Sequence, residues 1–93
     1  MKNNTYMVKN YRLLAEKFAD EGNEERALEF YKKAYLLKEG RRNVDLLLDM
    51  AVFYDELGEE ELAMEKFDEV LRVNPKDAGA YYGKAIIYDN KRQ

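Results

Sequence analysis

The chain has 93 residues, with 16 Lys and Arg against 19 Asp and Glu, a net charge of −3, and no Cys or His. Because it also lacks Ser, it offers no disulfide, no thiolate or imidazole metal ligand, and no triad of serine and histidine. We therefore expect a protein that is not an enzyme and uses no metal and no cofactor. Its mild acidity argues against nucleic acid as a partner, since polyanion binding rests on excess Lys and Arg.

The composition is typical of one small helical domain. Hydrophobic residues make up 46% of the chain and charged residues 38%, while one Pro and five Gly leave little material for β-turns. No uncharged stretch approaches the ~20 residues of a membrane-spanning helix, and the N-terminus lacks the apolar core of a signal peptide. We expect a single domain, residues 1–93, located in the cytoplasm.

The sequence contains an internal repeat. The motif Gly-x-Glu-Glu-x-Ala-x-Glu at residues 22–29 recurs at residues 58–65, an offset of 36 residues. A third, partial copy follows the second at an offset of 34 residues. In chain order, we expect a helical hairpin in repeat 1 (about 8–43), a second hairpin in repeat 2 (about 44–77) and a single helix in the partial repeat 3 (78–93). The third copy is aligned by three pairs, Leu47 with Tyr81, Ala51 with Ala85, and Tyr54 with Tyr88.

Each half of a repeat has the spacing of a helix. Apolar residues recur at i, i+3, i+4 and i+7, which places them in one stripe on a helix. Gly22 and Gly58 are expected to end helices in the left-handed conformation, and Asn23 and Asp77 are expected to cap the helices that follow. The aromatic residues in the stripes are expected to form the core: Tyr11, Phe18, Tyr31, Tyr54, Phe67 and Tyr81.

The pattern resembles the tetratricopeptide repeat family, whose unit is a pair of helices of about 34 residues. The resemblance runs from about Val8 to the end of the chain. It implies an all-α solenoid of five helices, stacked as antiparallel hairpins in a right-handed superhelix. Residues 38–43 depart from the family, which usually has a Pro-containing turn there. The matching residues are Tyr11, Leu14, Ala15, Phe18, Gly22, Ala27, Tyr31, Ala34, Leu47, Ala51, Tyr54, Gly58, Ala63, Phe67 and Pro75, then Ala80–Gly83, Ala85 and Tyr88.

The resemblance also implies a function, because members of the family bind peptides in a concave groove made by the first helix of each unit. We therefore expect a non-catalytic protein–protein interaction module, a scaffold that binds a peptide or partner protein. Apolar positions flanked by acids suit a ligand with aliphatic anchors and basic flanks. The opposite reading, that the acids only solvate an exposed helix face, stays open. The groove residues carried over are Arg12, Glu16, Asp45, Leu48, Asp49, Val52, Asp55, Tyr82, Ile86 and Asp89.

A narrower family function is not expected here. Co-chaperone members hold a C-terminal carboxylate with Lys, Asn and Arg, and the corresponding positions include Arg12, Glu16, Asp49, Gly79 and Gly83. Only Arg12 carries the required charge, so an acidic tail is not the expected partner. The acids between residues 59 and 69 are likewise expected to solvate a helix and not to bind Ca²⁺ or Mg²⁺, since side chains along a helix diverge.

The last predicted helix supports an alternative function. Residues 80–88 leave almost no polar face apart from Lys84, whereas a terminal repeat should turn a polar side to water. The alternative is a structural or assembly element that homo-oligomerises or stacks through Ile87 and Tyr88, or a piece of a longer repeat protein. The competing possibility is that this helix folds fully onto repeat 2.

Overall fold

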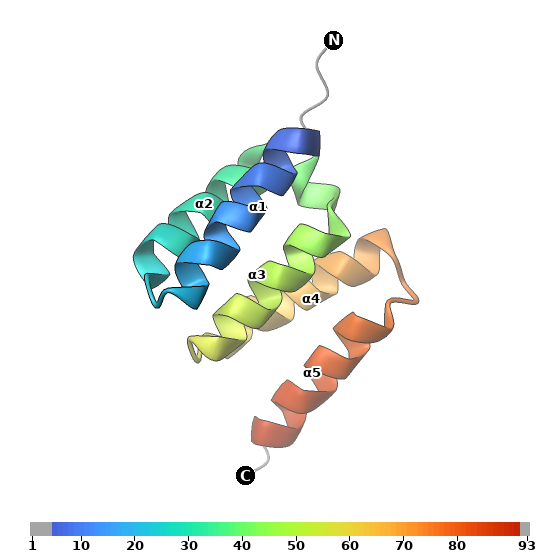
Figure 1. The fold of residues 1–93 in the computed structure, drawn as a ribbon. Coiled ribbons are helices and arrows are strands. Elements are labelled where there is room, and N and C mark those ends of the chain that lie inside the picture. Colours follow the sequence, from blue (N-terminus) through green and yellow to red (C-terminus); the bar gives the residue numbers. More distant parts are fainter. Residues whose placement is uncertain (1–4, 92–93) are drawn as a thin grey trace. The chain divides into compact units, whose positions relative to one another are not determined.

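Residues 5–91 are the part of the chain described by the computed structural model, and they form five α-helices and no strand (Figure 1). The order is α1 (Thr5–Asp20), α2 (Glu24–Leu36), a short 3-10 helix η1 (Gly40–Arg42), α3 (Val44–Glu56), α4 (Glu60–Val73) and α5 (Ala78–Lys91). The predicted all-α architecture of five helices is confirmed. The chain divides into two compact units, residues 1–46 and 47–93, with the boundary inside α3.

The first unit is built on the hairpin of α1 and α2, which lie side by side (Figure 1). Gly22 turns the chain with φ +80°, a conformation in which any Cβ would be strained. The amide of Asn23 then donates to the Phe18 carbonyl at 2.8 Å, and the side-chain oxygen of Asn23 accepts from the Arg26 amide at 3.1 Å. Both the left-handed Gly22 and the Asn23 cap are therefore as predicted. The buried residues of the hairpin are Val8, Ala15, Ala27, Tyr31 and Ala34.

An aromatic cluster closes one side of this hairpin. The Phe30 ring stacks on Phe18 with centroids 5.6 Å apart and lies 6.0 Å from Tyr11. Arg26 sits 5.1 Å from the Phe18 centroid, and Lys33 sits 5.1 Å from that of Phe30, both within cation–π range. Tyr11 and Phe18 are thus half-buried, at the edge of the core that they were predicted to fill, while Tyr31 is buried as predicted.

The segment that departs from the family is an ordered turn. Gly40 in η1 is buried, and its amide donates to the Leu37 carbonyl at 2.9 Å. Asn43 follows, and its side-chain oxygen accepts from the Leu46 amide at 2.9 Å, as a residue that caps a helix does. The cap of α3 was not predicted.

The second unit repeats the hairpin geometry. Gly58 has φ +82°, and the Glu59 amide donates to the Tyr54 carbonyl at 2.8 Å, the counterpart of the bond from Asn23 to Phe18. Asp77 accepts from the Ala80 amide at 2.9 Å and so caps α5, as predicted. The buried residues of this unit are Leu47, Met50, Ala51, Phe53, Tyr54, Ala63, Phe67, Val70, Ala80 and Ile87.

Two predictions for α5 are wrong. Ile87 is fully buried, so it is not part of an exposed docking face, and Tyr81 is 55% exposed, so it is not a core residue. The repeat explains the first error, because the offset of 34 residues that aligns Tyr54 with Tyr88 also aligns buried Phe53 with Ile87. The second error arises because Tyr81 occupies the face that a second helix covers in a complete hairpin. Tyr88 is 55% exposed.

Candidate functional site

An apolar pocket of about 320 Å³ lies in the second unit. Helices α3, α4 and α5 all contribute to it. Its lining residues are Leu48, Val52, Asp55, Phe67, Gly79, Tyr82, Gly83 and Ile86.

The helical spacing of these residues explains how they meet. Leu48, Val52 and Asp55 recur at intervals of four and three residues, so they share one face of α3. The α5 residues 79, 82, 83 and 86 follow the same rule and share one face of that helix. Two helix faces thus form the walls.

The floor of the pocket depends on a glycine. A Cβ placed on Gly83 would lie 2.2 Å from Cζ of Phe67, well inside van der Waals contact. The Phe67 ring therefore occupies the space that a side chain at position 83 would need, and only 4% of Phe67 remains exposed. Gly79 lies on the same face of α5, one turn earlier. A Cβ built on Gly79 would lie 3.8–3.9 Å from the methyl carbons of Leu48.

The walls are apolar and accessible to water. Val52 is 49% exposed, Tyr82 70% and Ile86 38%, and these three residues surround the pocket together with half-buried Leu48. Asp55 is the one charged group in the lining. Exposed apolar side chains that gather in one hollow, with a charge at the edge, are typical of a surface that contacts another molecule.

Five of the ten predicted groove residues meet in this pocket: Leu48, Val52, Asp55, Tyr82 and Ile86. Asp49 and Asp89 belong to the same unit but do not line it. Arg12 and Glu16 lie in the first unit, one turn apart on α1, where the Arg12 guanidinium donates to the Glu16 carboxylate at 2.7 Å. Asp45 is exposed in the first turn of α3.

Phe67 is the lining residue that sequence reasoning assigned only to the core. A signal for it exists in the sequence, because glycines at positions 79 and 83 leave one face of a helix without side chains. Such a face leaves room for an aromatic ring from a neighbouring helix, although the sequence alone does not show which ring packs there.

An ion pair links α5 to α4. The Lys84 ammonium donates to the Asp68 carboxylate at 2.5 Å. This hydrogen bond is the main reason why the pKa of Lys84 is raised above its ordinary value of 10.5. Lys84 stands at a position that is apolar in the earlier repeats, since it aligns with Met50 and Leu14.

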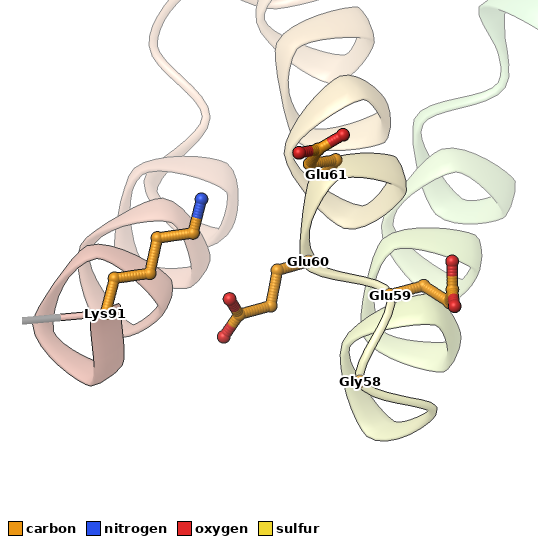
Figure 2. Close-up of a pocket in the computed structure, with 5 residues that line it drawn as sticks. All are labelled: Gly58, Glu59, Glu60, Glu61 and Lys91. Atoms are coloured by element: carbon orange, nitrogen blue, oxygen red, sulfur yellow. The ribbon is translucent and has the colours of Figure 1, made fainter. Parts of the chain in front are cut away.

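A second hollow, near the start of α4, is lined by Gly58, Glu59, Glu60, Glu61 and Lys91. Figure 2 shows that the three carboxylates point in different directions, with Glu59 turned away from the side where Lys91 lies. Among residues 5–91, no group of three or more His, Cys, Asp or Glu side chains is arranged to hold a metal ion.

The comparison with protein families agrees with the helical pattern. The model of the family described as "Tetratricopeptide repeat" matches residues 18–87. The chain belongs to the tetratricopeptide repeat family. Proteins of this family are helical repeat proteins whose stacked hairpins present surfaces for binding other proteins, so the chain is placed among protein-interaction modules.

The curated relatives are assembly proteins. The chain is 34% identical over 71 residues to the photosystem I assembly protein Ycf3 of Prochlorococcus marinus strains MIT 9301 and MIT 9215, and 32% identical to that of strain MIT 9312. The match covers 75% of this chain but 41% of each relative. The chain therefore spans about two fifths of the length of these relatives. No solved structure matches significantly.

Within the part of the chain that is described, no helix is long and apolar enough to cross a membrane.

The pocket residues of α3 and α5 come from the first helix of repeat 2 and of repeat 3. These are the helices that line the ligand groove in the family.

Proposed function

We propose that the chain is a non-catalytic binding module that holds an extended or helical segment of a partner protein in the pocket of α3, α4 and α5. The observation that carries the proposal is the accessible apolar lining formed by Val52, Tyr82 and Ile86 over the Phe67 ring. Its volume of about 320 Å³ lies at the small end of the ~300–1,000 Å³ usual for ligand pockets. It suits an anchoring side chain of a larger partner.

The charge around the pocket favours a basic partner. Asp55 lies in the lining, and residues 44–77 hold three basic and eleven acidic side chains, a net charge of −8. A ligand with an aliphatic residue for the pocket and Lys or Arg beside it gains both apolar burial and charge complementarity. Asp49 and Asp89, in the same unit, would extend the acidic surroundings met by basic flanks.

The substitution Val52→Arg tests the proposal. Val52 is half-exposed, so an Arg there keeps the fold but places a bulky cation in the pocket and against the ligand's basic flank. The probes are a library of labelled peptides with a fixed central Leu and randomised flanks, and its counterpart with a fixed Asp. We expect Leu peptides with basic flanks to bind, and Val52→Arg to weaken them at least ~10-fold, as for a hot-spot residue. Binding is measured by fluorescence polarisation.

The matched control is Leu36→Arg, which makes the same change of charge at a residue that is 70% exposed in the first unit. It should bind the same peptides as the unmodified chain. Equal binding by the chain and by Val52→Arg, or a preference for acidic flanks, would contradict the proposed site.

A second candidate function is self-association of the chain through α5. Of the two residues predicted for that face, Tyr88 alone is exposed. The test is sedimentation velocity over a wide range of concentrations, in which the unmodified chain should shift to a dimer and Tyr88→Lys should remain monomeric. A chain that stays monomeric at all concentrations excludes this candidate.

A further inference from the structure

The two ends of the apolar pocket differ. Leu48 and Gly79 lie together at one end, where a Cβ built on Gly79 would be 3.8–3.9 Å from the Leu48 methyl carbons. Asp55 and Ile86 follow seven residues later on α3 and α5, which run in the same direction through the second unit (Figure 1). Asp55 therefore lies at the opposite end of the pocket from Leu48, about 10 Å further along the helix axis.

The carboxylate of Asp55 has no partner among the described residues. Within residues 5–91, it takes part in no ion pair and no side-chain hydrogen bond, although the residue is half-buried. Other acids of the second unit are paired: Asp68 with Lys84, and Glu69 with Lys66 at 2.9 Å. The carboxylate of Asp55 is therefore available to a ligand.

The end of the pocket at Leu48 and Gly79 offers no such group. An Asp77 oxygen lies 3.2 Å from the Cβ position of Gly79, but the same oxygen already accepts from the Ala80 amide at 2.9 Å. The charge of Asp77 is also balanced by the positive end of the α5 dipole, which it caps. The available carboxylate is thus at one end of the pocket only, at Asp55.

A ligand that fills the pocket also covers Asp55, and this makes its charge important at one position. A carboxylate that loses water without gaining a partner raises the free energy of the complex. A Lys or Arg placed against Asp55 supplies that partner. A base at the end formed by Leu48 meets apolar surface and a carboxylate that is already hydrogen-bonded, so it gains much less.

The spacing along α3 indicates where this base stands in the ligand. The anchoring side chain lies over the Phe67 ring beside Val52, and Asp55 is three residues further on, about 4.5 Å along the helix axis. In an extended segment every second side chain points to the same side, and two such residues are about 6–7 Å apart. The base is therefore two positions from the anchor, and its flexible stem accommodates the difference.

We propose that Asp55 determines the specificity of the pocket by pairing with one Lys or Arg of the ligand, two positions from the aliphatic anchor and on one side of it only. The inference rests on the proposed function and deepens it. The acidic surroundings as a whole favour bases on both flanks, whereas a single carboxylate at one end selects one base and gives the bound segment a single orientation.

The test uses four labelled peptides with a central Leu among Ser and Gly residues. One has no Lys, two have a single Lys two positions before or after the Leu, and one has both. We expect one single-Lys peptide to bind the intact chain about as tightly as the double-Lys peptide, and the other about as weakly as the peptide without Lys. Fluorescence polarisation should show a difference of about 10-fold, near the lower end for close charge pairs at interfaces.

Substitutions at the end of α3 assign the preference to one carboxylate. Asp55→Asn keeps the size and removes the charge, so it should bind the two single-Lys peptides equally. The matched control is Glu56→Gln, which removes the same charge from the next residue, exposed and outside the pocket lining, and should keep the preference. Asp55→Lys should prefer Glu at the position where the unmodified chain prefers Lys. Circular dichroism verifies that the helices are retained.

The outcomes separate this inference from the proposed function. Equal binding of the two single-Lys peptides by the unmodified chain would overturn the inference, and so would a preference that survives Asp55→Asn. Both results leave the pocket as a binding site, because the Leu peptides still bind. Failure of all four peptides and of the Leu library would instead remove the proposed function, and the role of Asp55 with it.

Discussion

The pocket depends on the absence of a single side chain. At Gly83, even a methyl group would meet the Phe67 ring at 2.2 Å, so Gly83→Ala must displace the ring or move α5 away from α4. We expect overpacking to cost about 1–3 kcal/mol of unfolding free energy, offset in part by the ~1 kcal/mol advantage of Ala over Gly in a helix. Urea denaturation measures the net loss.

The comparison for this prediction is Gly79→Ala on the same face of α5. Its Cβ would lie 3.2 Å from an Asp77 oxygen and 3.8 Å from a Leu48 methyl group, so these neighbours would have to move less than the Phe67 ring. It should lose less stability than Gly83→Ala. If Gly83→Ala loses no more stability than Gly79→Ala, the ring does not occupy the position described.

Two residues that are adjacent in the sequence can differ strongly in solvent exposure. Ile87 and Tyr88 both look like apolar surface in the sequence, yet Ile87 is fully buried and Tyr88 is 55% exposed. Periodicity alone could not separate them, because most of the sectors of α5 carry apolar residues. The alignment with Phe53 and Tyr54 does separate them once the burial of α3 is known.

The ion pair of Lys84 with Asp68 lay beyond sequence reasoning for another reason. Its partners are 16 residues apart on different helices, so the contact depends on how α5 packs on α4. The sequence showed only that Lys84 replaces an apolar residue of the repeat. Since both side chains remain partly exposed, the pair contributes roughly 0–1 kcal/mol to stability and acts mainly by fixing the position of the charge.

At the scale of elements, the local signals predicted the helices well. The turns at Gly22 and Gly58 and the caps at Asn23 and Asp77 depend on residues within one turn of each other, so the sequence contains all the information they need. Helix η1 was missed because its defining contact is the close approach of Gly40 to the end of α2, which no local pattern encodes.

That close approach gives a prediction for η1. A Cβ on Gly40 would lie 1.9 Å from the Ala34 carbonyl oxygen, a backbone atom that cannot swing aside. Gly40→Ala should therefore shift η1 and disturb the Asn43 cap of α3, at a cost of about 1–3 kcal/mol as for other overpacked sites. The measurements are urea denaturation and the hydrogen-exchange rate of the Leu46 amide, which should rise.

The matched control in the same turn is Arg41→Ala. Arg41 is exposed, so its substitution should change stability by no more than about 0.5 kcal/mol. Equal effects of the two substitutions would contradict the contact between Gly40 and α2.

At the scale of the whole molecule, a net charge of −3 conceals a strong asymmetry. Residues 1–43 hold ten basic and seven acidic side chains, a net charge of +3, and residues 78–93 hold three and one, a net charge of +2. Residues 44–77, at −8, supply the acidic part of the site. The proposed ligand follows this division, because the acidic surroundings of the pocket favour a basic segment.

The repeat made most of the fold predictable, since two periods in register define the hairpins and the family. The site was half predictable: α3 and α5 supply the predicted apolar residues, but the Phe67 floor required the packing of α4 against Gly83. The assignment of residues 1–93 to one domain and the cytoplasmic location remain predictions.

The exposed apolar face that Tyr81 and Tyr88 form on α5 carries a risk of a different kind. Contacts that join unlike surfaces of identical molecules need not close into a ring, and they then grow into filaments. Lys84 lies one helical turn from both tyrosines, at the position where the earlier repeats have Leu14 and Met50, and it pairs with Asp68. Burying this pair under a purely apolar surface would cost desolvation energy that such a surface cannot return. A charged pair beside the two tyrosines therefore disfavours a purely apolar contact on this face of α5.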